Sequence, residues 1–339
     1  MADSALARDA LFQLNVLVWA FFPQPPDAPV TPLVDTGYSL WTVEQPLEAG
    51  LTELASLRLA SNITANPVAD AVLFHEGRNE FVLVECKPAT FGPGSDRAAH
   101  QARGFIVAAG AASSRLGVGG QATGEACHVV PFLDAGNVDQ TLASLAEELS
   151  DGGFQCGPTG AVGIDVRSDG VYLGIDQQPT GTAHFPSAIL PARRVIGAAL
   201  GQDPRPLYLV PWIPNSEGSD LTALREKVRA LMIVWLGRAR TPGTEMLSLD
   251  QLLDDVTRGV FRYWRNRDSL RGEVLPVVGR IITALFTNDP RVHVRLTDVE
   301  FVLTSEQNRQ QLIEMARTAK LSGPMPQGVQ LSLEGPPTP

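Results

Sequence analysis

Two acidic residues and a lysine are spaced in a way that could support chemistry on a phosphate group. Within residues 67–87, PVADAVLFHEGRNEFVLVECK, Asp70 lies in one short apolar run, Glu85 lies in a second, and Lys87 follows two residues later. Side chains two positions apart on a strand point to the same face, so Glu85 and Lys87 project together. Carboxylates are the hard oxygen ligands that Mg²⁺ prefers, and a neighbouring lysine can hold a water or neutralise charge that develops on a phosphate.

The two apolar runs predict a β-hairpin. Residues 68–74 and 81–86 are separated by HEGRNE, whose turn residues let the chain fold back around Gly77 and bring Asp70 near Glu85. The second run has apolar side chains on both faces, as in a buried central strand. Carboxylates at the end of such a strand are costly to bury unless they are paired or hold a metal.

A helix after the hairpin is expected to bring a glutamine to the same place. Ser95 is a candidate N-cap, and Ala98, Gln101, Ala102 and Phe105 then share one helical face. Gln101 therefore points toward the sheet, where a water or the Lys87 region can serve as its partner. A glutamine that caps a backbone group is the alternative.

Asp70, Glu85-Cys86-Lys87 and Gln101 together resemble the PD-(D/E)XK nuclease superfamily, over roughly residues 44–133. Pro67 stands three residues before Asp70 rather than beside it. The resemblance implies an α/β fold with a restriction-endonuclease-like mixed sheet flanked by helices, and Mg²⁺- or Mn²⁺-dependent cleavage of phosphodiester bonds. The implied catalytic residues are Asp70, Glu85, Lys87 and Gln101. The implied metal ligands are Asp70, Glu85, the Cys86 carbonyl and an upstream carboxylate from a helix at 46–60, with Glu53 preferred over Glu48 and Glu44.

The resemblance favours DNA over RNA as the substrate and, by analogy, defence against foreign DNA as the setting, with a homo-oligomer or a target-recognition protein as a compatible partner. Three other interpretations stay open. The chain could be a non-catalytic nucleic-acid-binding or assembly subunit that retains the nuclease fold, or an unrelated enzyme with a carboxylate–lysine pair. Asp70, Glu85 and Lys87 could also form an ordinary salt bridge at a strand end.

Charge is distributed unevenly along the chain of 339 residues, whose net charge is −10. Residues 1–150 hold 7 Lys and Arg against 17 Asp and Glu, whereas residues 151–339 hold 20 against 20. Nucleic-acid contact is therefore expected in the second half or through a partner. Eight arginines between positions 258 and 295, with Tyr263 and Trp264 among them, form what we call the arginine block. Arg262, Arg265 and Arg267 are its candidate phosphate contacts, and a solvated surface is the alternative.

The chain is long enough for two domains. We expect a nuclease-like domain at 1–150 that begins with an amphipathic helix at 3–21, and a disordered tail at 323–339. Between them, at 151–322, we expect an accessory α+β region with a winged-helix-like arrangement. The elements predicted in that region are a hairpin at 161–175, strands at 206–213 and 291–303, and helices at 221–236, 249–256, 274–286 and 306–320.

Three cysteines without a CxxC motif favour a reducing cytoplasm. No segment has the length of a membrane span, and the apolar run at 11–22 lacks the positive flank of a signal peptide.

Overall fold

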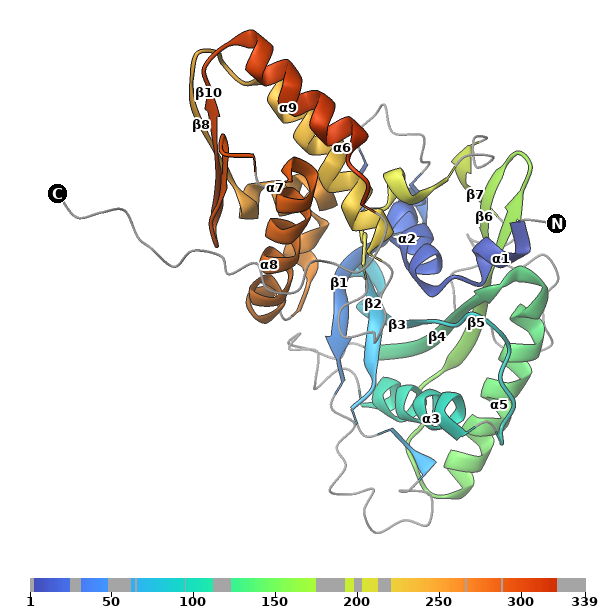
Figure 1. Ribbon diagram of the computed structural model, residues 1–339. Helices are drawn as coiled ribbons and strands as arrows, with labels where there is room; N and C mark the ends of the chain where they lie inside the picture. Colours follow the sequence, from blue (N-terminus) through green and yellow to red (C-terminus); the bar gives the residue numbers. More distant parts are fainter. Residues whose placement is uncertain are drawn as a thin grey trace. The chain divides into compact units, whose positions relative to one another are not determined.

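The computed structural model describes residues 3–24, 32–47, 62–64, 66–94, 96–111, 123–174, 193–197, 203–212, 221–265, 267–287 and 289–321. The chain forms two compact units. Unit 1 comprises residues 1–202 together with 263–265, and unit 2 comprises residues 203–262 and 266–339. The ribbon in Figure 1 follows the order of the elements within each unit.

Unit 1 is an α/β structure built on a mixed seven-stranded sheet in the order β1-β2-β3-β4-β5-β6-β7. The strands β3, β4 and β5 are parallel to one another, and the other neighbours are antiparallel. The strands are β1 (Tyr38–Pro46), β2 (Val68–His75), β3 (Glu80–Cys86), β4 (Thr123–Pro131), β5 (Thr159–Arg167), β6 (Gly170–Gly174) and β7 (Arg193–Gly197). The helices are α1 (Asp3–Ala7), α2 (Ala10–Phe21), α3 (Asp96–Gly110) and α5 (Ala135–Asp151).

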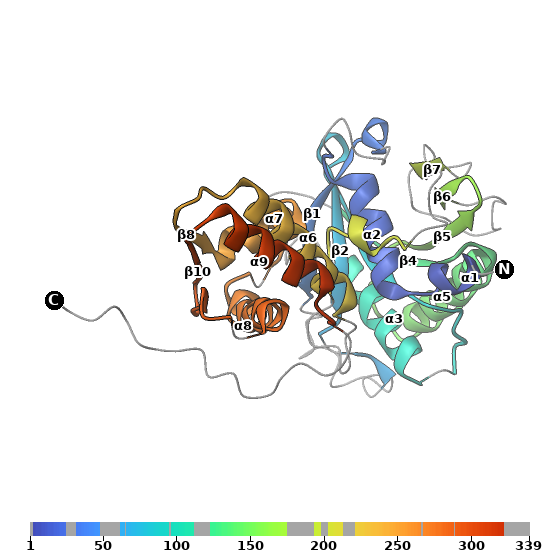
Figure 2. The same ribbon diagram turned by 45° about the horizontal axis from the view of Figure 1, so that its top comes forward.

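Helices cover both faces of this sheet, which explains the continuous apolar runs in its strands. Phe81 and Leu83 of β3 pack with Phe105 of α3, and α5 adds its apolar side chains beside α3. The alternate residues of β3, Val82 and Val84, are also fully buried and face the opposite side. Figures 1 and 2 show α2 on that side, across the sheet from α3 and α5.

The predicted amphipathic helix at 3–21 is wrong in two respects. The helix is broken at Arg8 and Asp9 into α1 and α2, and the Asp9 carboxylate caps α2 by accepting a hydrogen bond from Phe12 N at 2.7 Å. Every residue of α2 from Phe12 to Phe21 is buried. A helix that is buried all round has no polar face, so its apolar excess reflects a place in the core.

The expected domain boundary at residue 150 is also wrong. The strands β5, β6 and β7 continue the sheet of the first unit by hydrogen bonding, so that unit extends to Gln202. The predicted hairpin at 161–175 is confirmed as β5 and β6. Residues 263–265 return to unit 1, where Trp264 forms a bridge with Val43 of β1.

In its described residues, unit 2 combines four α-helices with a three-stranded antiparallel sheet in the order β8-β10-β9. Its helices are α6 (Thr222–Arg238), α7 (Leu249–Thr257), α8 (Arg267–Phe286) and α9 (Glu306–Thr318), and its strands are β8 (Gly243–Ser248), β9 (Val292–Val294) and β10 (Asp298–Leu303). Ser248 caps α7 as expected, since its hydroxyl accepts from Gln251 N. The helices predicted in this region are confirmed, and α8 begins seven residues before the expected start at 274.

Two strand predictions in unit 2 are corrected. The segment expected as a strand at 206–213 begins with a short 3-10 turn, Arg205–Leu207, and carries no strand within its described residues, up to 212. The single strand expected at 291–303 is two strands, β9 and β10, which pair antiparallel around a turn. Alternating apolar residues run through that turn, so periodicity alone did not reveal the reversal.

Several predicted features lie outside the described residues. They are Glu48, Glu53 and most of the helix expected at 46–60, the candidate cap Ser95, and the tail at 323–339. Within the described part of the chain, no helix has both the length and the apolar character needed to cross a bilayer.

Candidate active site

The β2–β3 hairpin brings Asp70 and the Glu85–Lys87 triplet together as the spacing predicted. The antiparallel register pairs Ala71 with Val84, the residues that directly follow Asp70 and precede Glu85. The Asp70 carboxylate accepts a hydrogen bond from Cys86 N at 2.7 Å, which fixes one of its oxygens at the end of β3. The turn itself is a short 3-10 segment, Glu76–Arg78, followed by Asn79 in the left-handed region.

Lys87 links the triplet to helix α3. Its Nζ lies 2.6 Å from Glu85 Oε1 and donates a hydrogen bond to Gln101 Oε1 at 3.0 Å. Gln101 therefore points toward the sheet, and it holds the ammonium group rather than capping a backbone group. Lys87 is 12% exposed and Glu85 only 2% exposed, so the pair lies at the edge of the core with its ammonium end nearer to solvent.

His128 of β4 completes the surroundings of Glu85. Parallel pairing of β3 with β4 places Glu85 opposite His128, and Nδ1 of the ring lies 3.1 Å from Glu85 Oε2. The ring is fully buried, with Phe91 and Phe105 at centroid distances of 5.6 and 6.1 Å. The two groups are at ion-pair distance without the alignment of a full hydrogen bond.

Gln13 of α2 supports the triplet from the opposite face of the sheet. Its side-chain amide is fully buried and donates to Lys87 O at 2.7 Å and to Ala7 O at 2.8 Å. Lys87 N donates to Val129 O at 2.8 Å, so the backbone of Lys87 is held on both sides. The polar residue that interrupts the apolar run at 11–22 thus ties α2 to the end of β3.

Burial controls the protonation of these groups. Desolvation raises the pKa of Asp70 to about 6 and that of Glu85 to about 8, although Lys87 acts in the opposite direction on both. The charge on Asp70 also raises the pKa of Glu85. Burial, with Lys87 nearby, lowers the pKa of His128 to about 3, so the imidazole is neutral at physiological pH. A cation bound between the carboxyls would favour their ionised forms.

Buried polar atoms without hydrogen bonds bear on whether Mg²⁺ or Mn²⁺ fits here. The Glu85 oxygens and the His128 nitrogens are buried and form no well-aligned hydrogen bond, although Lys87 and His128 lie 2.6 Å and 3.1 Å from the two Glu85 oxygens. Buried polar atoms of this kind are uncommon, and they have remaining capacity for an ion or a water. The two carboxylates suit a divalent ion, but among the described residues no group of three His, Cys, Asp or Glu side chains is arranged to hold one. Asp70 and Glu85 thus fit Mg²⁺ or Mn²⁺ as two of its ligands, and the ion would need further oxygen ligands.

Of the other predicted ligands, Glu44 and Cys86 can be located. Glu44 accepts a hydrogen bond from Trp264 Nε1 at 3.2 Å. The Cys86 thiol is buried, and burial raises its pKa well above the ordinary value, so it is a packed core group as expected. Any ligand from Cys86 would be its carbonyl.

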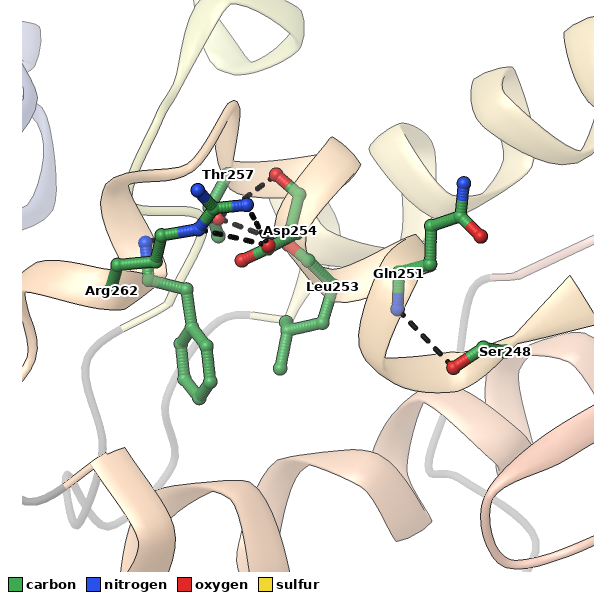
Figure 3. Close-up of polar contacts among 7 residues, drawn as sticks. Ser248, Gln251, Leu253, Asp254, Thr257 and Arg262 are labelled. Atoms are coloured by element: carbon green, nitrogen blue, oxygen red, sulfur yellow. Dashed lines mark hydrogen bonds and ion pairs between the residues drawn. The ribbon is translucent and has the colours of Figure 1, made fainter.

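The arginine block differs from the sequence expectation, because carboxylates neutralise much of it. Arg262 Nη2 lies 2.6 Å from Asp254, Arg271 is paired with Asp250, and both aspartates belong to α7. Figure 3 shows the Arg262 guanidinium against Asp254 above the turn that ends α7. Arg267 is half exposed and has only a 4.0 Å contact with Asp268. Arg265 is exposed but belongs to unit 1, so the three candidate arginines do not share one unit.

Sequence reasoning missed His128 and Gln13. A signal existed for both, since each is a polar residue inside an apolar stretch of the sequence: His128 in CHVVPFL at 127–133, and Gln13 in the run at 11–22. Comparison of the chain with protein-family models, with curated proteins and with solved structures finds no match. The interpretation of the site therefore rests on its geometry and chemistry.

Proposed function

We propose that this chain is a metal-dependent nuclease that hydrolyses phosphodiester bonds, with DNA as the favoured substrate. The observation that supports this most is the convergence of Lys87 with Glu85 at 2.6 Å and with Gln101 at 3.0 Å, beside the buried carboxylate of Asp70. These are the four side chains that the PD-(D/E)XK resemblance nominates. The elements form a mixed sheet flanked by helices, with helices before β1–β2–β3 and then α3, β4 and α5. A restriction-endonuclease-like core is the finer assignment that the proposal adds to this architecture.

In this proposal each residue has a separate task. Asp70 and Glu85 would hold Mg²⁺ or Mn²⁺, with the Cys86 carbonyl and an upstream carboxylate as further ligands. The bound ion would lower the pKa of a water and offset charge on the phosphate. Lys87, held by Gln101, keeps an ammonium next to the carboxylates, where it can orient the attacking water or stabilise negative charge on the phosphate oxygens. Gln13 fixes the backbone that carries Lys87.

Unit 2 would contribute to nucleic-acid or partner binding. Its element order, α6–β8–α7–α8–β9–β10, and its sheet order, β8-β10-β9, are compatible with the winged-helix-like arrangement that the sequence suggested. In that arrangement, Arg267 at the start of α8 is available to contact phosphate, because it is exposed and only weakly paired. Defence against foreign DNA stays a prediction, which rests on analogy.

Cleavage of plasmid and single-stranded oligonucleotides, with and without Mg²⁺ or Mn²⁺, tests the proposal. The wild-type protein should cut only with the ion, and Asp70→Asn should remove cutting below detection. Asp165→Asn is the matched control, because Asp165 is also an aspartate on a strand of unit 1 but is a third exposed and paired with Arg167. Equal cutting by the wild-type and Asp70→Asn proteins would contradict the proposal.

One observation favours the second candidate, a non-catalytic nucleic-acid-binding or assembly subunit. The described residues include no complete metal-binding group, and both Glu85 oxygens already face Lys87 and His128. Titration calorimetry with Mn²⁺ separates the two functions. A nuclease should bind the ion through Asp70 and Glu85, whereas a subunit that has lost catalysis should bind nucleic acid without binding Mn²⁺.

A further inference from the structure

We infer that His128 is a positioning residue for Glu85: it holds the Oε2 atom of that carboxylate so that Oε1 stays directed toward Lys87 and the proposed metal. This inference rests on the proposed function and adds a residue that the nuclease resemblance does not nominate. Each oxygen of the Glu85 carboxylate has a different neighbour. Lys87 Nζ lies 2.6 Å from Oε1, and His128 Nδ1 lies 3.1 Å from Oε2.

The sheet register places His128 in this position. Because β3 and β4 are parallel, with Glu85 opposite His128, the two side chains leave the same face of the sheet side by side. The same face carries Phe81, Leu83 and Ala126, which pack against α3. Glu85 and His128 are therefore the polar end of an otherwise apolar layer, and neither can reach bulk water without leaving it.

The surroundings of the ring restrict how it can turn. His128 is fully buried, Phe91 is tilted against it, and Phe105 meets it edge-on. Phe105 follows Gln101 by one helical turn on α3, so a single helix supports both the ring and the Lys87 ammonium. Glu85 thus lies between two groups that α3 holds in place.

A residue held in this way is suited to orient a metal ligand. Carboxylates that bind metals are themselves hydrogen-bonded, and removal of such a partner typically costs about 10- to 100-fold in metal affinity or activity. Hydrogen bonds of this kind are often poorly aligned before the substrate and its ion are bound, and they tighten in the complex. The 3.1 Å contact without full alignment is consistent with that behaviour.

The test compares three variants by Mn²⁺ calorimetry and by the Mn²⁺ concentration that gives half-maximal cleavage. His128→Leu fills the apolar layer but has no donor, and we expect it to weaken Mn²⁺ binding by about 10- to 100-fold. His128→Asn keeps an N–H close to the position of Nδ1 and should recover most of that loss. Cys127→Ala is the control: its side chain is buried on the same strand but points to the other face, so Mn²⁺ binding should stay at the wild-type value.

Two outcomes would overturn the inference without touching the proposed function: wild-type Mn²⁺ affinity in folded His128→Leu protein, or equal losses in His128→Leu and His128→Asn. Should the variants not fold, nitrogen NMR of the wild-type ring decides, because the role requires the proton on Nδ1. A ring protonated on Nε2 alone would overturn it. Failure of the proposed function looks different, since the wild-type protein would then bind no Mn²⁺ at all.

Discussion

The carboxylate–lysine site of unit 1 and the part of the arginine block that lies in unit 2 both pair acids with bases, but they do so in different surroundings. Glu85 is 2% exposed and Lys87 is 12% exposed, whereas Arg262 is 67% exposed and Arg271 is 45% exposed. Burial in unit 1 raises the pKa of both Asp70 and Glu85. Water screens the pairs that Arg262 and Arg271 form with Asp254 and Asp250, so each contributes little to stability.

This difference suggests different uses for similar residue types. A buried pair cannot exchange partners without a high desolvation cost, so it holds its groups in fixed positions, as a reaction centre requires. An exposed pair opens at small cost, so Arg262 can leave Asp254 for a phosphate, but the remaining aspartate reduces the net gain. We therefore expect substitutions in the first region to change rates strongly and substitutions in the second to change binding modestly.

Among the substitutions that test this comparison, Lys87→Met should have the largest effect. Methionine keeps most of the packing volume of the lysine stem but has no ammonium, and loss of such a preorganised donor typically lowers a rate by about 100- to 1000-fold. Single-turnover cleavage at saturating Mg²⁺ measures the change, and thermal unfolding checks the fold. Arg97→Met, which removes an exposed positive charge from α3, is the control and should cleave normally. A large loss of stability with little loss of rate would instead make Lys87 a structural partner of Glu85.

Lys227 tests whether burial, and not the unit, causes the difference between the two regions, because it is a buried charge in unit 2. It is 7% exposed, and burial, with Arg258 nearby, lowers its pKa to about 7. An unfolded lysine titrates near 10.5, so between these values the unfolded chain binds more protons, and the free energy of unfolding rises with pH. Below pH 7 the folded protein bears the whole cost of the buried charge.

Lys227→Met should therefore stabilise the protein by a few kcal/mol at pH 6, and by progressively less as the pH approaches 10. Denaturant unfolding of both proteins across this range measures the difference. Lys320→Met, at an exposed lysine of the same unit, should show no such trend. A pH-independent difference would mean that Lys227 acts through packing or through its contact with Pro206 O.

Arg267→Ala should have a smaller effect, limited to nucleic-acid binding. Each phosphate contact contributes about 0.9 to the slope of log affinity against log salt concentration for duplex DNA, so loss of one contact should reduce the slope by roughly that amount. Arg262→Ala should reduce it less, because Asp254 already holds that guanidinium. Equal slopes for the wild-type and Arg267→Ala proteins would identify the block as a solvated surface or a protein interface.

The smallest expected effect is that of Asp254→Asn on stability. The pair with Arg262 is largely exposed, and pairs of this kind contribute about 0.2–1 kcal/mol. The same substitution removes a negative charge and releases Arg262, so it should strengthen DNA binding and steepen its dependence on salt. Filter binding at several salt concentrations measures this. Weaker binding by Asp254→Asn would show that Asp254 orients Arg262 for its contact instead of competing for it.

The sequence by itself determined the parts of the site that depend on short-range rules. The two-residue period of a strand placed Glu85 and Lys87 on one face, the turn residues closed the hairpin that brings Asp70 to Cys86 N, and helical spacing turned Gln101 toward Lys87. Each of these relations spans fewer than twenty residues. The repeat of a strand, a turn or a helix fixes each relation, and that repeat can be recognised in a single sequence.

Only the tertiary structure decided which distant residues join those parts. His128 reaches Glu85 because β3 and β4 pair in parallel, and Gln13 reaches Lys87 across 74 positions because α2 is packed into the core. The aspartates that neutralise Arg262 and Arg271 lie just before the arginine block in sequence, so a charge count over positions 258–295 does not include them. Strand pairing and helix packing depend on the burial of apolar surface over the whole unit, and no short stretch of sequence reveals them. The same long-range packing decides which residues become the partners of a buried charge.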